Sequence, residues 1–176
     1  MAEPLILTGR GTVLCSFTSD DITDEYIAWL NDPVVVQYSN QRFRLHTRQS
    51  SQHYLESFDN SNNLFLLIRI KESGLPIGTI TAYRAVFHQT ADMGIMIGNR
   101  NFWGKGIGLD AWTTLMDYLL GSLRLRKITG GTLRCNIGMV RIMERSGMQQ
   151  EAIRRFQEIV DGQPEDVLYY ARFGNK

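Results

Sequence analysis

Few of the 176 residues belong to the types that bind metals or form disulfides. The two cysteines, Cys15 and Cys135, have no metal-ligand spacing, and two are too few for a disulfide framework. The three histidines, His46, His53 and His88, form no ligand pattern such as HxxxH. We therefore expect no metal site.

Long apolar runs and a strong net charge are also lacking. No stretch approaches the roughly 18 apolar residues of a membrane span, so we expect no membrane contact. A net charge of +1 gives no basic field for nucleic acid. The N-terminus shows no basic-then-apolar signal sequence, which favours a cytoplasmic location. The hydrophobic content of 43% and the length suit a single globular domain over residues 1–176.

The most informative stretch runs from Ala91 to Leu120. An apolar run over Met93–Ile97 predicts a buried strand, and a glycine-rich turn over Gly104–Gly108 follows it. The next residues have apolar side chains at helical spacing. Glycines allow close backbone approach, and the free N–H groups and dipole at a helix start favour phosphate. The turn is therefore a candidate anion site, although a strand-to-helix connection that binds nothing would look the same.

The spacing of this turn excludes two common phosphate-binding motifs. It matches neither the Walker pattern nor GxGxxG, because Gly104, Gly106 and Gly108 are followed by Leu109. It resembles instead the acetyl-CoA signature of the GNAT superfamily of N-acetyltransferases, Gln/Arg-x-x-Gly-x-Gly/Ala, with Trp103 replacing the first residue. The phrase FWGKGIG is similar to the branch that contains ribosomal-protein and nucleotide-sugar N-acetyltransferases.

A second segment, Asn136–Met148, resembles the family pattern NxxAxxxYEKxGF. Met143 stands where many members have a tyrosine that protonates the leaving thiolate, and methionine cannot donate a proton. Asn136 matches the family asparagine that contacts the pantetheine arm, and it also suits a helix N-cap.

The order of predicted elements also resembles the GNAT fold. We expect an α+β fold with about four helices and a central, mostly antiparallel, splayed mixed sheet of about seven strands. The predicted strands cover residues 13–17, 64–70, 77–87, 91–97, 127–133, 148–160 and 167–173. Helices are expected near residues 22–30, 47–57, 109–120 and 136–146.

The resemblance implies acetyl-CoA as co-substrate, bound by the strand, the glycine turn and the helix that follows Asn136. The implied contacts are Ile95, Met96, Ile97, Trp103, Gly104, Lys105, Gly106, Ile107, Gly108, Asn136, Met139 and Arg145. Backbone N–H groups of Ile95–Ile97 would stabilise the developing oxyanion.

Acetyl transfer to an amine needs a base, because alkylamines are protonated near neutral pH. Asp92 lies where some family members keep a catalytic glutamate, although a surface aspartate that pairs with a neighbour would fit equally. Glu151 is a second candidate, with a salt bridge to Arg154 or Arg155 as the structural alternative. His88 is a third, because its intrinsic pKa is suitable.

The acceptor is less clearly indicated. The first helix and the aromatic loop behind it look like members that acetylate amino sugars carried on nucleotides. The expected substrate contacts are Trp29, Tyr38, Asn40, Arg42 and Tyr83, with either Arg42 or Arg44 expected to bind a diphosphate. A protein N-terminus, a small polyamine, or a non-catalytic acyl-CoA-binding role remain as alternatives. An exposed last strand could pair two copies of the chain into a homodimer.

Overall fold

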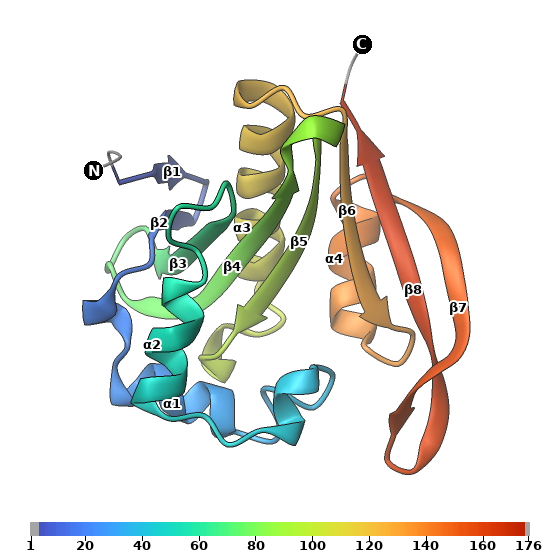
Figure 1. Cartoon of the computed structure of the whole chain (residues 1–176), viewed down its shortest axis with the longest axis horizontal. Helices are drawn as coiled ribbons and strands as arrows, with labels where there is room; N and C mark the ends of the chain where they lie inside the picture. Colours follow the sequence, from blue (N-terminus) through green and yellow to red (C-terminus); the bar gives the residue numbers. More distant parts are fainter. Residues whose placement is uncertain (1–3, 175–176) are drawn as a thin grey trace.

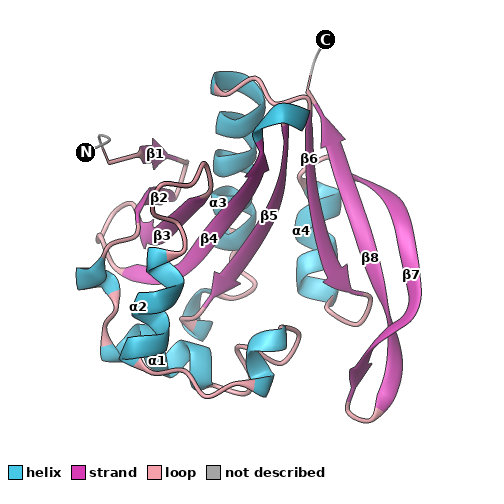
Figure 2. Cartoon of the chain, viewed as in Figure 1, coloured by secondary structure: helices cyan, strands magenta, loops and turns pink. Residues whose placement is uncertain are grey.

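The computed structural model describes residues 4–174, which form an α+β fold built on one sheet of eight strands (Figures 1 and 2). The strands are β1 Ile6–Thr8, β2 Thr12–Ser16, β3 Leu64–Ile70, β4 Pro76–Ala85, β5 Thr90–Ile97, β6 Lys127–Leu133, β7 Gln149–Val160 and β8 Gln163–Phe173. The α-helices are α1 Asp24–Asn31, α2 Arg48–Glu56, α3 Ile107–Asp117 and α4 Ile137–Arg145. The spatial order is β1-β2-β3-β4-β5-β6-β8-β7.

The predicted fold class is confirmed, with one strand more than the expected seven. The additional strand is β1, whose three residues alternate between exposed and half-buried and pair antiparallel with β2. Strand β8 begins at Gln163 rather than Val167, because its polar first residues pair with β7. In the described range, no helix combines the length and apolarity needed to cross a membrane.

Helices cover both faces of the sheet (Figure 1). Helix α3 lies behind β4 and β5, and its Trp112, Leu115 and Met116 are fully buried in the larger core. Helix α4 lies behind β6 and β8. On the opposite face, α1 packs Tyr26 and Trp29 into a second, smaller core.

The sheet splits between β5 and β6, its one parallel pair among the described strands. These strands pair only from Thr90 to Asp92, which lie opposite Lys127 to Thr129. Beyond Asp92, β5 stays paired with β4 as far as Ile97 but has no strand partner on its other edge. The two strands diverge beyond this pair (Figure 1). The space between them, called the wedge below, is lined by residues of β5, α3 and α4.

The N-terminal turn of α3 is fixed by Asp110. Its carboxylate accepts hydrogen bonds from the backbone N–H groups of Arg10, Gly11 and Thr12, and from the Thr12 hydroxyl at 2.7 Å. Burial raises the pKa of Asp110, but these hydrogen bonds outweigh it and bring the pKa below its ordinary value. The start of α3 is thereby held against the turn between β1 and β2.

Candidate functional site

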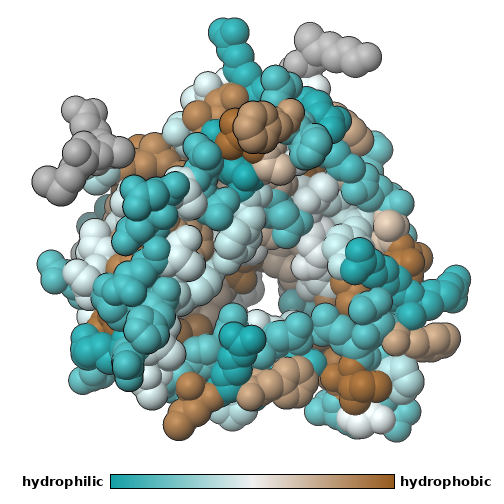
Figure 3. Space-filling model, viewed as in Figure 1, coloured by the Kyte–Doolittle hydropathy of each residue, from teal (hydrophilic) through white to brown (hydrophobic). Residues whose placement is uncertain are grey.

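A cavity of about 950 Å³ occupies the wedge and continues over the front of β4 and β5. Figure 3 shows the molecule hollowed at the centre of this face. Ten of the twelve residues expected to contact acetyl-CoA line it: Ile95, Met96, Ile97, Trp103, Gly104, Gly106, Gly108, Asn136, Met139 and Arg145. The other two lie outside the lining. Lys105 faces the Phe102 ring, with its Nζ 5.7 Å from the centroid, and Ile107 packs against the larger core.

The glycine turn has the geometry of an anion cradle. Gly104 and Gly106 have φ angles of +72° and +78°, which glycine adopts without strain, and a Cβ at either position would meet no atom within 4 Å. Gly106 is also the N-cap of α3 and offers no side-chain cap, so the first N–H groups of this helix are available to a ligand. An uncapped, open turn at the mouth of the cavity fits the pyrophosphate of coenzyme A.

Asn136 and Met143 form part of the opposite wall of the wedge. The Asn136 side chain caps α4 by accepting a hydrogen bond from the Met139 N–H at 3.3 Å, so its N-cap role is present. Met143 is buried and lies close to Gly130 on β6. A thioether here supplies shape rather than a proton.

Asp92 borders a smaller hollow of about 330 Å³ that adjoins the cavity. Its Oδ1 accepts a hydrogen bond from the Thr129 hydroxyl at 2.6 Å, across the last pair of β5 and β6. The carboxylate is accessible from the hollow, yet the surrounding protein desolvates it and raises its pKa, against the Thr129 hydrogen bond that lowers it. The residue thus lies where the two strands begin to separate.

The other two base candidates lie elsewhere. Glu151 forms an ion pair with Lys127, at 2.7 Å between Nζ and Oε2, and not with Arg154 or Arg155 as expected. Glu151 lines neither the cavity nor the hollow. His88 ends a short turn beyond β4, and neither hollow includes it. Asp92 is the one of the three that the fold brings to the wedge.

Only two of the five expected substrate contacts line the cavity or the hollow. Tyr38 lines both the cavity and the hollow, and Asn40 lines the hollow. Trp29 instead packs in the smaller core, where a Cβ on Gly98 would collide with its ring. Tyr83 lies outside both spaces.

Arg42 bridges the short helical turn Asn40–Phe43 to the hairpin of β7 and β8. Its guanidinium donates to the backbone oxygens of Ser39 at 2.8 Å and Ile159 at 3.1 Å, and lies 4.0 Å from the Glu158 carboxylate. These partners occupy the group that was expected to bind a diphosphate.

Several residues that line the cavity or the hollow belong to no motif that would have predicted them as site residues. Tyr26, Ser51, Tyr54, Thr79 and Thr81 line the cavity, and Glu158 lines the hollow. Ser51 and Tyr54 share a helical face at i and i+3, but only packing against β4 turns that face into a cavity wall.

Comparison with known proteins places the chain in a family. Residues 12–149 match the family model described as an acetyltransferase (GNAT) domain, which covers more than half of the chain. The chain therefore belongs to the GNAT acetyltransferase family.

Two curated relatives and one solved structure illustrate the similarity. The chain is 32% identical over 92 residues to the probable N-acetyltransferase YjcK of Bacillus subtilis (strain 168), covering 51% of this chain and 50% of that protein. It is 29% identical over 117 residues to the uncharacterized N-acetyltransferase p20 of Bacillus licheniformis, covering 65% and 64%. The chain thus spans between half and two thirds of the length of these relatives.

Among solved structures, the chain superposes on RimL, a ribosomal L7/L12 alpha-N-protein acetyltransferase in complex with coenzyme A. The TM-score is 0.84 at 15% identity, covering 97% of this chain and 98% of that one. At this identity the likeness establishes the shared fold alone.

Proposed function

We propose that the protein is an acetyl-CoA-dependent N-acetyltransferase that moves an acetyl group directly to a primary amine. The observation that carries the proposal is the position of Asp92, which sets a carboxylate of raised pKa at the point where β5 and β6 separate. The glycine turn lines the cavity, and Asp92 lines the hollow, which shares Met93 and Gly94 of β5 with that cavity. A donor and an acceptor bound from these two sides would meet beside it.

Acetyl-CoA supplies the acetyl group as a thioester, and the chain supplies binding and proton transfer. The N–H groups from Gly104 to Gly108 hold the pyrophosphate, and the unpaired edge of β5 after Asp92 offers N–H donors to carbonyl oxygens. Holding both substrates in one cleft contributes to the rate by itself.

Asp92 takes the proton that the ammonium group of the acceptor must lose before attack. Its Oδ1 is held by Thr129, while Oδ2 has no hydrogen-bond partner among the described residues. The raised pKa makes this carboxylate a better base than an ordinary aspartate. As the C–N bond forms, the C–S bond breaks, and the sulfur leaves as thiolate because Met143 at the family's tyrosine position cannot protonate it. The new amide nitrogen releases its second proton to water, and the thiolate, whose thiol has a pKa of about 8.5, is protonated by water near neutral pH.

For the acceptor, we propose an amino sugar carried on a nucleotide. Tyr38 could stack on a ring, and Gln37 and Gln41 present amides to the same cavity. Arg44 also lines the cavity, and it takes over the phosphate role that Arg42 cannot fill.

A protein N-terminus is the second candidate, because the hollow is lined by two carboxylates, Asp92 and Glu158, that attract an ammonium group. RimL, which shares the fold, is named for that reaction.

The test is the variant Asp92→Asn, which keeps the size and the hydrogen bond from Thr129 but removes the base. We expect kcat to fall roughly 100-fold or more, with the acetyl-CoA Kd from calorimetry changed less than about twofold. Asp59→Asn, in an exposed loop, is the matched control. Unchanged kcat would remove Asp92 from the mechanism, and wild-type protein that does not bind acetyl-CoA would remove the proposed function.

A further inference from the structure

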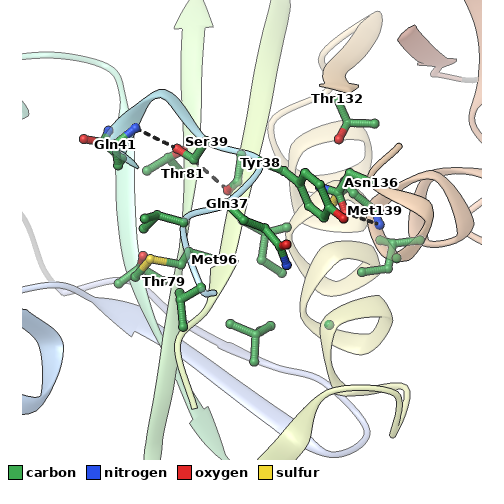
Figure 4. Close-up of a pocket in the computed structure, with 18 of the residues that line it drawn as sticks. Gln37, Tyr38, Ser39, Gln41, Thr79, Thr81, Met96, Thr132, Asn136 and Met139 are labelled. Atoms are coloured by element: carbon green, nitrogen blue, oxygen red, sulfur yellow. Dashed lines mark hydrogen bonds between the residues drawn. The ribbon is translucent and has the colours of Figure 1, made fainter. Parts of the chain in front are cut away.

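Four parts of the chain line the smaller hollow: β5, β6, the hairpin of β7 and β8, and the α1–α2 loop of residues 32–47. The loop contributes Tyr38 and Asn40, and the hairpin contributes Glu158. Figure 4 shows the loop crossing the cavity between Thr81 on one side and Asn136 on the other. The spacing between the loop and the hairpin therefore sets the width of the hollow.

The tip of the hairpin extends beyond the rest of the sheet (Figure 1). Strand β6 pairs with β8 only over residues 167–173, whereas β7 and β8 continue to pair with each other through the hairpin tip, residues 158–165. A register shift precedes the tip at Phe156, whose N–H donates to the Asp166 carboxylate at 2.9 Å. Bulges bend a strand, and a two-stranded hairpin is marginally stable by itself. The hairpin tip thus depends on contacts outside the sheet for its position.

The base of the α1–α2 loop is fixed to the end of α1. The Asn31 side chain donates to the His46 carbonyl at 2.8 Å, and the His46 N–H donates to the Asn31 Oδ1 at 2.9 Å. The His46 ring also lies 3.2 Å from the Gln41 carbonyl oxygen, measured from Nε2. These bonds close the loop, but they do not fix its distance from the hairpin tip.

Arg42 supplies the link between the loop and the hairpin tip. Its Nη2 donates to the Ile159 carbonyl at 3.1 Å, its Nη1 donates to the Ser39 carbonyl at 2.8 Å, and the side chain is only 16% exposed. The Glu158 carboxylate lies 4.0 Å away. Among the described residues, no other hydrogen bond or ion pair joins residues 32–47 to residues 149–173. The planar guanidinium holds the two carbonyl groups in fixed directions, which the single ammonium of a lysine cannot do.

We propose that Arg42 is a positioning residue for the acceptor, which it affects through the two segments it joins. Arg42 holds Tyr38 and Asn40 at the hollow from one side and Glu158 from the other. The inference rests on the proposed function, in which Asp92 takes the acceptor's proton beside this hollow. If the link is lost, acceptor binding must also order the loop and the hairpin tip, which costs affinity. The loss applies to every class of acceptor, because it concerns the shape of the hollow.

The variant Arg42→Lys tests this role because it keeps the positive charge and removes the planar fork. The acceptors are a UDP-linked amino sugar, glucosamine and the peptide Ala-Ala-Ala. We expect KM to rise about tenfold for every acceptor that the wild type uses, while kcat and the acetyl-CoA Kd stay within about twofold. A direct contact with a diphosphate would instead affect the UDP-linked sugar alone.

Hydrogen exchange of the free protein gives a readout that does not depend on turnover. In Arg42→Lys, amides of the hairpin tip should exchange about tenfold faster, and amides of α3 should be unchanged. A role confined to the loop would change exchange in residues 32–47 alone.

Two other variants complete the design. Arg48→Lys is the matched control, since the Arg48 guanidinium also donates to a backbone carbonyl, that of Ile22, and pairs with Asp24 at 2.9 Å, outside both the cavity and the hollow. It should leave KM and the exchange of the hairpin tip unchanged, whatever its effect on Tm. Phe43→Ala removes a ring whose centroid lies 4.3 Å from the Arg42 Cζ, and it should raise the acceptor KM about threefold.

The outcomes separate the two levels of the argument. If Arg42→Lys leaves the exchange of the hairpin tip unchanged, or raises KM for the UDP-linked sugar but not for glucosamine, the positioning role is wrong while the acetyltransferase proposal stands. If the wild-type protein acetylates no amine of the panel, the proposed function falls, together with the role of Arg42 in it.

Discussion

Replacing Asp110 with asparagine should loosen α3 from the β1–β2 turn and lower stability. Oδ2 accepts three hydrogen bonds, from Gly11, Thr12 and the Thr12 hydroxyl, and Oδ1 accepts one from Arg10. Asparagine keeps one acceptor oxygen, so its amide group would face the Arg10 N–H donor to donor. The remaining bonds lose their charge assistance, which roughly halves their strength.

From one lost bond and three weakened ones, with the partial exposure of the site taken into account, we expect a loss of about 2–3 kcal/mol. For a chain of this size the loss corresponds to a fall in Tm of about 5–10 °C. Calorimetry at pH 7 measures it, with Asp117→Asn, exposed in the last turn of the same helix, as the control.

The pH dependence provides a sharper test of the same site. Because folding lowers the pKa of Asp110, its stabilisation is complete above the unfolded pKa of about 3.9 and is lost as pH falls through the lower folded pKa. In denaturant titrations, the difference between wild type and Asp110→Asn should be constant from pH 7 to about 5 and shrink below about pH 4. A difference under 1 kcal/mol at pH 7, or one that grows in acid, would refute this account.

Two further substitutions test the glycine turn Gly104–Gly108 and Glu151, the base candidate that lines neither the cavity nor the hollow. Gly106→Ala forces a side chain into a positive φ with no steric contact, so we expect about 1 kcal/mol of strain and an acetyl-CoA Kd raised several-fold in calorimetry. Gly121→Ala, in equally open space without a positive φ, should change neither, and equal losses in both variants would count against the cradle. Glu151→Gln removes the ion pair to Lys127 and should leave kcat within about twofold, since exposed pairs contribute little. A large fall in kcat would make Glu151 the base after all.

The residues that the sequence predicts to contact acetyl-CoA come together in one cavity because that part of its wall is built from local backbone. A run of apolar residues, a glycine turn and a helix start are contiguous over Met93–Leu109, and the features that matter are φ angles and N–H groups. Such features depend on residue types within a short window. The prediction therefore placed ten of its twelve residues in one cavity.

The expected substrate contacts do not come together in this way, because tertiary packing decides where each of them lies. Trp29 looked like a substrate contact, but the missing side chain of Gly98, about 70 residues later, makes room for it in the core. Arg42 looked free to bind phosphate, but its partners come from a hairpin more than 100 residues away.

The unpaired edge of β5 has a consequence for how this protein tolerates mutation. Between Met93 and Ile97 the donors that face the wedge belong to the peptide backbone, so every residue type except proline provides them. Changes of side chain there alter the width of the cleft but leave its hydrogen-bonding pattern intact. Ile95→Pro would delete a donor outright, whereas Ile95→Val would retain the whole pattern. The hydrogen-bonding groups of this edge are thus set by the backbone, so side-chain substitutions between Met93 and Ile97 leave them in place.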